Sequence, residues 1–439
     1  MPNTRAAPSA PALRFANALA RRELLPWILL GVTLGLVEGG TAAVLVKQHF
    51  RGAGSTAAVN FAVSVVSAAP TIANVLSFAW ANLGHGRARV PLLVSLQLLF
   101  ALTVGLIGLA PNVLGGLLFT VLSILAARIV WAGILTLRSS VWIANYPRNT
   151  LARMTGRVVV GGSLMVALTS ALVSAALQSG AVDTKQLYMA AALAGIAAAF
   201  LYRRTRTRRE FRMLDAENLA SGTTAMFSLR VLREILRTDK AFRDYMLWMG
   251  VYGAGSVMMT SQLIVIMTDQ LQIPSQQQIM MLTVIPMLTL PVFVPFWARI
   301  FDRQHTVTFR SQQGWVMVGA YVLSSIGVLF AWPPGLWAGA ILLGAALAGA
   351  SFGWNLGHQD FAAPGRAQQY MGVHVTLAGL RGMIAPPFGM LCYQGLEAWH
   401  RGAGRFSILL PTAVTAAGAI GFNHLRKKHY ISRKQGQTQ

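Results

Sequence analysis

Acidic residues are scarce in this sequence. Asp and Glu together number 13 of 439 residues, and charged residues of both signs make up 11%, whereas an average soluble domain has about 25%. Hydrophobic residues make up 54%, and the mean hydropathy is +0.53. So few charges do not suit a water-exposed surface, and the composition indicates a protein of the lipid bilayer.

Cysteine is almost absent, and so are the motifs of catalysis. The single cysteine, Cys392, lies in an apolar segment, which excludes a disulfide framework or a multi-cysteine metal site within the chain. The sequence has no Gly-rich lysine loop for a nucleoside triphosphate, no His-Glu-x-x-His helix and no nucleophilic serine elbow. We therefore expect no enzyme, no cofactor and no metal site.

Apolar segments long enough to cross a bilayer recur along most of the chain, without the alternating pattern of an outer-membrane barrel. They predict an all-α integral membrane protein with about twelve transmembrane helices. The expected spans are 25–48, 57–82, 90–110, 113–137, 157–178, 186–202, 244–268, 277–299, 313–331, 335–357, 370–395 and 406–423. The first could be mistaken for a signal peptide, but its apolar run continues past Glu38, so we expect an uncleaved helix.

Basic residues collect in alternate loops, which predicts the orientation of the chain. Lys and Arg number 37 and give a net charge of +24, and such residues are retained on the cytoplasmic side of a membrane. This explanation is preferred to nucleic-acid binding, and it allows contact with anionic membrane lipids. We expect a multi-pass protein of the bacterial inner membrane with both termini in the cytoplasm.

A polar interruption divides the spans into two sets of six. The predicted parts are a cytoplasmic segment 1–24, a six-helix half 25–202, a basic cytoplasmic loop 203–243, a second six-helix half 244–423 and a basic tail 424–439. Within the loop, Leu229, Leu232, Ile235 and Leu236 would lie on one face of an amphipathic helix, 228–243.

Related segments end corresponding spans of the two halves, which indicates an internal duplication. WANLGHGRARV covers 80–90 after the second span, and WARIFDRQHTV covers 297–307 after the eighth. The chain here resembles the major facilitator superfamily, whose Gly-x-Leu-Ala-Asp-Arg-type loop is matched in the second copy at Ala298, Ile300, Asp302 and Arg303. The first copy keeps Leu83 and Arg89 but has His85 and Gly86 where Asp and Arg are usual.

The resemblance implies two pseudo-symmetric six-helix halves and a secondary transporter that works by alternating access. It also implies a cytoplasmic latch, here Asp302, Arg303 and Arg89. In the fourth span, Arg128 with Ala132 and Gly133 looks like the family's Arg-x-x-x-Gly motif, offset by one residue. The fifth span lacks the Gly-Pro pair of many drug/proton antiporters, which weakens but keeps open the alternative of multidrug or metabolite efflux by proton antiport.

Ionisable residues within spans are the candidates for coupling, because a charge at the bilayer centre costs about 2.5 to 3.5 kcal/mol on insertion scales. Glu38 lies in the first span beside Gly31, Gly35 and Gly39, whose spacing suits close helix packing. A carboxyl group is neutral in an apolar setting and ionised beside a cation, so Glu38 could carry a proton or form a permanent ion pair.

His374 and Arg381 are seven residues apart in the eleventh span and share a helical face. His374 is the second candidate for proton coupling, with a structural histidine as the alternative, and Arg128 is the third. Arg128 and Arg381 together outnumber Glu38, so a cavity lined by them would favour an anionic solute. Each arginine could instead snorkel or pair internally.

The resemblance places spans one, four, seven and ten around the central cavity. The residues nominated there to bind substrate, besides Arg381, are Trp131, Trp248, Tyr252, Gln262, Trp354 and Asn355. We expect a monomer that moves a small organic solute, anionic or amphipathic, with proton coupling as an option. The rival from another class is a receptor or assembly scaffold on the same fold that transports nothing.

Overall fold

A computed structural model describes residues 10–146, 148–180, 183–208, 210–211, 214–215, 229–363 and 366–428, and all regular structure in these ranges is helical. Ten of the described helices are long and apolar enough to cross a membrane, or eleven when the bent pair α1 and α2 counts as one span. A further 24-residue helix, α14, packs between α15 and α17. The prediction of an all-α membrane protein with about twelve spans is confirmed.

The N-terminal half consists of eight helices and one short 3-10 turn, many of them within a few residues of the predicted spans. They are α1 (Ala10–Val37), α2 (Gly39–His49), α3 (Thr56–Ile72), η1 (Ala73–Leu76), α4 (Ser77–Gly84), α5 (Arg89–Ile107), α6 (Leu114–Asn145), α7 (Arg148–Ser179) and α8 (Thr184–Tyr202). Tyr146, which follows α6, is extended (φ −108°, ψ 132°), as expected for a residue before proline. Pro147 lies outside the described residues.

The C-terminal half repeats this arrangement. It contains α10 (Leu229–Thr238), α11 (Lys240–Asp269), α12 (Ser275–Ile279), the π turn η2 (Met280–Val284), α13 (Ile285–Phe301), α14 (Thr306–Leu329), α15 (Pro333–Asn355), η3 (Gly357–Asp360), α16 (Ala367–Trp399), η4 (Ala403–Ile408) and α17 (Leu409–Arg426). The predicted ninth span began at 313, whereas α14 begins at Thr306. Helix α16 continues through Pro386 and Pro387.

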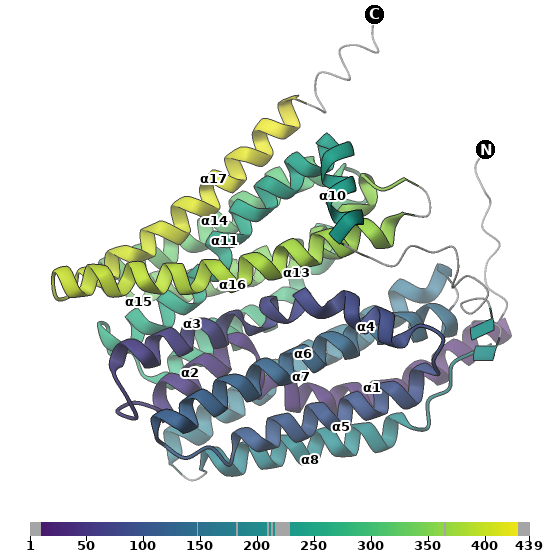
Figure 1. Ribbon diagram of the computed structural model, residues 1–439, viewed down its shortest axis with the longest axis horizontal. Helices are drawn as coiled ribbons and strands as arrows, with labels where there is room; N and C mark the ends of the chain where they lie inside the picture. Colours follow the sequence, from purple (N-terminus) through teal and green to yellow (C-terminus); the bar gives the residue numbers. More distant parts are fainter. Residues whose placement is uncertain are drawn as a thin grey trace, which may run out of the picture.

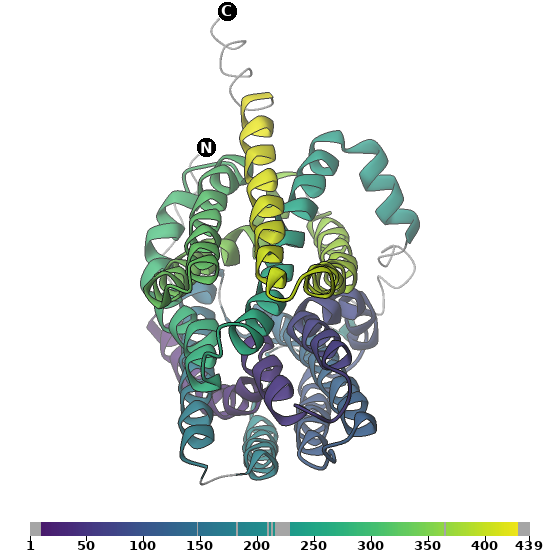
Figure 2. The same ribbon diagram turned by 90° about the vertical axis from the view of Figure 1, so that its left-hand side faces the viewer.

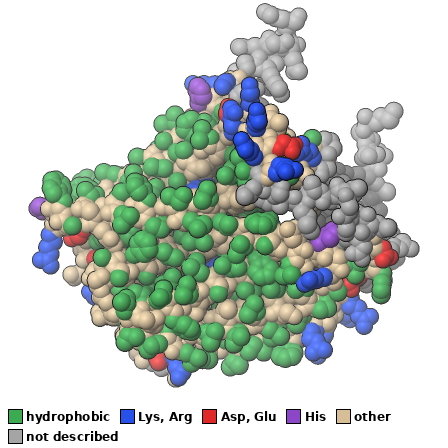
Figure 3. All heavy atoms as spheres, viewed as in Figure 1, with side chains coloured by type: hydrophobic (Ala, Val, Ile, Leu, Met, Phe, Trp, Pro, Cys, Tyr) green, Lys and Arg blue, Asp and Glu red, His purple; other side chains and the backbone are tan. Residues whose placement is uncertain are grey.

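Both ends of the chain lead to the same end of the bundle, since α1 begins and α17 ends there (Figures 1 and 2). We call this the terminal end. The opposite end, formed by the turns after α2, α5, α7, α11, α14 and α16, is the distal end. Hydrophobic side chains cover most of the face shown in Figure 3, and Lys and Arg gather toward its edges. Such an apolar belt suits contact with lipid.

The first span is broken at Glu38, where a single continuous helix was predicted. Glu38 is extended (φ −69°, ψ 136°), and α1 and α2 meet at an angle of 45°. Gly31 and Gly35 pack α1 closely on Met165 and Thr169 of α7, whereas Gly39 lies against Ser67 of α3. The predicted span is thus present as a bent pair of helices, and the break was not predicted: the glycines on either side of it pack on different neighbours.

The duplicated sequence segments form equivalent contacts in the two halves. A Cβ atom on Gly133 of α6 would lie 2.7 Å from the Trp80 ring, and one on Gly349 of α15 would lie 2.9 Å from the Trp297 ring. Each tryptophan therefore requires a glycine on the facing helix. Gly133, which the sequence assigned to the fourth-span motif, has this packing role.

Helix α10 packs its apolar face on protein. Ile235 is fully buried and Leu232 and Leu236 are partly buried, with α11 and α16 as neighbours. The predicted amphipathic helix thus exists, but it ends at Thr238, where Asp239 begins α11 by accepting a hydrogen bond from the amide of Phe242 (2.9 Å). The side chain of Leu229 and the tail beyond residue 428 lie outside the described residues.

Candidate functional site: a mid-membrane ion pair and a closed distal end

Glu38 and Arg128, nominated separately from the sequence, form an ion pair. Arg128 of α6 donates from Nη1 to Oε2 of Glu38 at 3.1 Å, and the two side chains are 8% and 22% exposed, respectively. The break after α1 leaves Glu38 outside the helix, so its side chain extends toward α6 from an irregular backbone. Glu38 is therefore the more exposed member of the pair.

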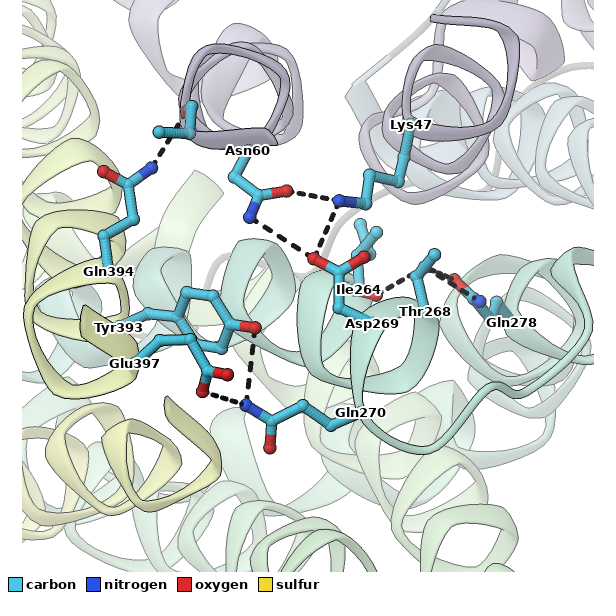
Figure 4. A network of polar contacts seen from close by, with 11 residues as sticks. Lys47, Asn60, Ile264, Thr268, Asp269, Gln270, Gln278, Tyr393, Gln394 and Glu397 are labelled. Atoms are coloured by element: carbon cyan, nitrogen blue, oxygen red, sulfur yellow. Dashed lines mark hydrogen bonds and ion pairs between the residues drawn. The ribbon is translucent and has the colours of Figure 1, made fainter. Parts of the chain in front are cut away.

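A second charged cluster joins the two halves at the distal end (Figure 4). The Nζ of Lys47 in α2 donates to Oδ2 of Asp269 in α11 at 2.8 Å, and the Lys47 side chain is only 5% exposed. Asn60 of α3 accepts from Lys47 and donates to the same carboxylate (3.3 Å). The cluster ties α2 and α3 of one half to α11 of the other.

Other polar contacts between the halves lie on the same side. Gln394 of α16 donates to the carbonyl of Ala57 (2.9 Å), and Ser174 of α7 donates to the carbonyl of Gln276 (3.1 Å). Deeper in the bundle, Thr41 and Thr283 are hydrogen-bonded across the halves (3.1 Å). Among the described residues, all side-chain hydrogen bonds between transmembrane helices of opposite halves lie in α2, α3, α7, α11, α12, η2 and α16 at or toward the distal end. This end is closed.

A third group of polar side chains lies inside the C-terminal half. His374 of α16 is fully buried and contacts Trp354 of α15, with ring centroids 4.6 Å apart. Arg381 lies about two turns further along the same face of α16. It donates to the carbonyl of Met249 in α11 (2.8 Å). Arg310 of α14 is buried nearby and acts electrostatically on both residues.

The remaining substrate-binding candidates are dispersed. Trp131 packs on Phe100 in the N-terminal half, Trp248 lies against Gly421 of α17, and Gln262 is fully buried and donates to the carbonyl of Gly389. Tyr252 is buried and its hydroxyl accepts from Gln313 (3.2 Å), while Asn355 is exposed at the end of α15. Among the substrate-binding candidates, Trp354 contacts His374, and Tyr252 lies within electrostatic range of Arg310 and Arg381.

The latch candidates are not joined to one another. Asp302 and Arg303 are exposed after α13, and no ion pair involves them within the described ranges. Arg89 is buried at the start of α5, where its amide binds Glu210 (3.2 Å). Nearby in the C-terminal half, Asp360 accepts from the amide of Thr306 at the start of α14 (2.7 Å).

A buried imidazole and a buried carboxylate also lie at the terminal end. Burial lowers the pKa of His358 in η3, and the Asp360 carboxylate partly offsets this effect. Glu23 of α1 is fully buried and accepts from the indole of Trp142 (2.8 Å), beside Arg138, whose guanidinium lies over the rings of Trp27 and Trp142. In the described part of the chain, no three His, Cys, Asp or Glu residues are grouped to hold a metal ion.

Sequence reasoning missed four of these charged residues. Lys47 and Asp269 were span ends, Glu23 lay just before the first predicted span, and Arg310 was assigned to a loop. The available signal was the sign of the charge: Lys47 is one of few cations on a side of the chain otherwise poor in them, and Asp269 is one of 13 acidic residues.

Comparison with known proteins supplies the family. A model of the Major Facilitator Superfamily matches residues 24–386, whereas a search of curated protein sequences finds no match. Solved structures with the same fold include the nucleoside transporter NupG (TM-score 0.68, 12% identity, 93% of this chain and 99% of that one). The POT family transporter PepTSo (0.69, 9%, 94% and 98%) and a D-xylose-proton symporter (0.67, 14%, 93% and 97%) are also similar.

These likenesses extend over both halves and include the 24–386 segment that contains Glu38, Arg128 and the Lys47 cluster. At such low identity the solved structures show the fold alone. The family match, which spans most of the chain, shows more: the protein belongs to the Major Facilitator Superfamily of membrane transporters.

Proposed function

We propose that this protein is a secondary active transporter that moves a small organic solute by alternating access, with proton coupling at Glu38. The observation that carries the proposal is the position of the contacts between the halves. They close the distal end around Lys47, Asn60 and Asp269, while the Glu38 and Arg128 pair lies deeper and remains partly exposed. Rocking of the halves would break the first group and open the other side.

Protonation of Glu38 would change the strength of its ion pair with Arg128, and so could affect the motion of the halves. Ionised Glu38 attracts Arg128 and holds α6 against the junction of α1 and α2. A proton on Glu38 removes that attraction and leaves the Arg128 guanidinium without its counter-charge, which is unfavourable at low dielectric. Protonation therefore favours a conformation in which Arg128 finds another partner.

We also propose that the protein lies in the bacterial inner membrane as a monomer, with the terminal end in the cytoplasm. The basic loops near that end support this orientation through the positive-inside rule. In this orientation the closed distal end faces outward, and the opposite end of the bundle faces the cytoplasm. The partners are the solute, protons and the lipids around the apolar belt.

The test replaces Glu38 by Gln in proteoliposomes. Glu38→Gln keeps a hydrogen-bonding oxygen for Arg128 but cannot exchange a proton. We expect solute accumulation driven by an imposed pH gradient to fall to the level without a gradient, while exchange of labelled for unlabelled solute continues. The control is Asp183→Asn, which removes an exposed carboxylate at the start of α8 and should leave both activities within about two-fold of the wild type.

Two results would contradict the proposal in different ways. If pH-driven accumulation is unchanged in Glu38→Gln, Glu38 is not the proton carrier. If the wild-type protein binds solutes but moves none, with or without a gradient, the protein is a receptor on the transporter fold.

A further inference from the structure

Three cationic or polar side chains lie together in the C-terminal half without an anion. Arg310 of α14 is 1% exposed and His374 of α16 is 0% exposed, and Arg381 of α16 is partly exposed beside them. Arg310 donates to Gln313, and Gln313 donates to Tyr252, whose neighbour Gly253 lies against Arg381. Both arginines act electrostatically on the imidazole, and Arg310 acts on Arg381. Three different positions on two helices thus bring positive charge and an imidazole to one place.

The hydrogen bonds of these groups are incomplete. Arg310 donates to Oε1 of Gln313 (3.0 Å) and weakly to the carbonyl of Ala350 (3.5 Å), and Arg381 donates to the carbonyl of Met249. Within the described residues, the Nε of both arginines and both ring nitrogens of His374 are buried without a partner. No carboxylate in the same ranges lies within ion-pair distance of either guanidinium.

Two cations that act on each other without a carboxylate partner are unfavourable inside a membrane protein, because their charges repel and neither is solvated by water as it would be outside. A structural arginine pair would be expected to have a carboxylate nearby, as Arg128 has Glu38. An oxyanion would relieve the repulsion and accept the remaining N–H donors, and guanidinium groups suit carboxylate and phosphate oxygens by shape.

Glycines make room for both guanidinium groups. A Cβ atom on Gly253 of α11 would lie 1.9 Å from Nη1 of Arg381, and one on Gly353 of α15 would lie 2.3 Å from Nε of Arg310. The arginines are therefore seated against the backbones of the seventh and tenth spans, and Trp354, which follows Gly353, contacts His374. Arg381 is the most exposed of the three side chains, so a ligand could reach it first.

We propose that Arg310, Arg381 and His374 form an oxyanion subsite, and that the transported solute carries a carboxylate or phosphate group that binds there. This proposal rests on the proposed transport function and adds the chemical class of the solute. The arginine pair differs from the one expected from the sequence: Arg310 takes the place of Arg128, whose charge is neutralised by Glu38.

The test measures binding in detergent, apart from transport. Sodium benzoate and inorganic phosphate are titrated into the purified protein and followed by its unfolding temperature, with benzamide as the uncharged match of benzoate. We expect benzoate or phosphate, but not benzamide, to raise the unfolding temperature in a saturable manner. In Arg310→Gln and in Arg381→Gln the Kd should rise at least about ten-fold, because a charged partner is lost.

Further variants separate a binding site from a structural one. Arg401→Gln removes an exposed arginine at the distal end and should leave the Kd unchanged. Gly253→Ala keeps every charge but displaces the Arg381 guanidinium, so it should weaken anion binding while the helix itself is favoured by alanine. Without anions, Arg381→Gln should unfold at the same or a higher temperature than the wild type, whereas loss of a purely structural arginine would lower it.

The proposal is overturned if neither anion stabilises the wild type, if benzamide acts as strongly as benzoate, or if both arginine variants keep the wild-type Kd. It is also overturned if only phosphatidylglycerol stabilises the protein, since the cluster would then bind a lipid headgroup. These outcomes are independent of the Glu38→Gln test: proton-driven transport of a neutral solute would support the transporter and refute the anion site.

Discussion

Lys47 is a cation buried between the halves, and its charge is balanced by one carboxylate from the other half. Asp269 is 22% exposed and Lys47 is 5% exposed, so separation of the halves would return both groups to water. If one of the two charges is removed, the other remains buried without a partner while the distal end is closed. The penalty is absent once the halves separate, because the remaining charge is then in water. The Lys47 and Asp269 ion pair therefore stabilises the closed distal end.

We predict that Asp269→Asn destabilises the closed distal end. Loss of one partner of a buried ion pair costs about 3 to 5 kcal/mol, and less where the partner is partly exposed, so we expect the transport rate to fall at least about ten-fold. The exchanged pair Lys47→Asp/Asp269→Lys should recover part of the rate, because the Asn60 amide can both donate and accept. Initial rates of solute uptake measure both effects.

The control is Arg243→Gln, which removes an exposed pair with Asp244 at the terminal end and should change the rate by less than about two-fold. Full activity of Asp269→Asn, or failure of the exchanged pair to exceed the single variant, would show that the pair does not govern closure of this end.

Single charged residues could be recognised from the sequence, but their partners could not. Glu38 and Arg128 each stand out in an apolar segment, yet they are 90 positions apart in the chain, and only the packing of α1 on its neighbours decides that they meet. Arg310 was missed for the opposite reason: with Arg303 nearby it resembled loop charge, although α14 begins four residues before it and buries it.

Two irregular helix segments meet where the halves contact each other inside the bundle. The break between α1 and α2 leads into Gly40 and Thr41, and the π turn η2 presents Thr283 to them. A Cβ atom on Gly40 would lie 2.7 Å from Oγ1 of Thr283. π turns often occur at functional sites in helices, and here one supplies a hydrogen-bonding side chain for the opposite half.

We predict that Gly40→Val forces these elements apart. Overpacking costs about 1 to 3 kcal/mol, and because the cost applies only while the halves touch, the ratio of closed to open molecules should fall about 5- to 150-fold. The measurement is the rate at which a membrane-impermeant maleimide labels the distal Asn60→Cys in a Cys392→Ala background. Asn60 is buried in the closed state, so labelling should accelerate.

Gly395→Val is the matched control, because a Cβ atom there has no neighbour within 4 Å, and its labelling rate should equal that of the Asn60→Cys parent. Equal rates for Gly40→Val and the parent would mean that the contact does not hold the distal end closed.

Helices were predictable at the level of spans but not of their interruptions. Apolar length gives the spans because the bilayer requires it, and α5 and α8 begin and end close to the predicted positions. The break at Glu38 and the π turn at Met280–Val284 depend on contacts with α3 and α7, and hydropathy carries no information about such contacts. The central loop beyond its final helix lies outside the described residues.

At the scale of the whole molecule, the two halves are joined by few polar contacts and by close backbone packing. Gly379 and Gly382 of α16 lie against Thr71, Ile72 and Val75 on α3 and η1. Glycines let the backbones of the two halves approach closely at these positions. The duplicated Trp and Gly contacts, in contrast, lie within each half and would stay intact while the halves move as rigid bodies.

A disulfide between the halves should therefore stop transport without disturbing either half. The hydroxyl oxygens of Thr41 and Thr283 are 3.1 Å apart, and the sulfur atoms of cysteines at these positions would approach the bonding distance of about 2.0 Å with small movements. In a Cys392→Ala background, oxidised Thr41→Cys/Thr283→Cys should lose nearly all uptake, and dithiothreitol should restore it.

The single variant Thr41→Cys, oxidised in the same way, controls for loss of the hydroxyl. Because the disulfide closes only the distal end, the locked protein should still bind solute from the terminal end with its usual Kd. Uptake that continues at the normal rate after complete oxidation would exclude alternating access by separation of the halves at this contact.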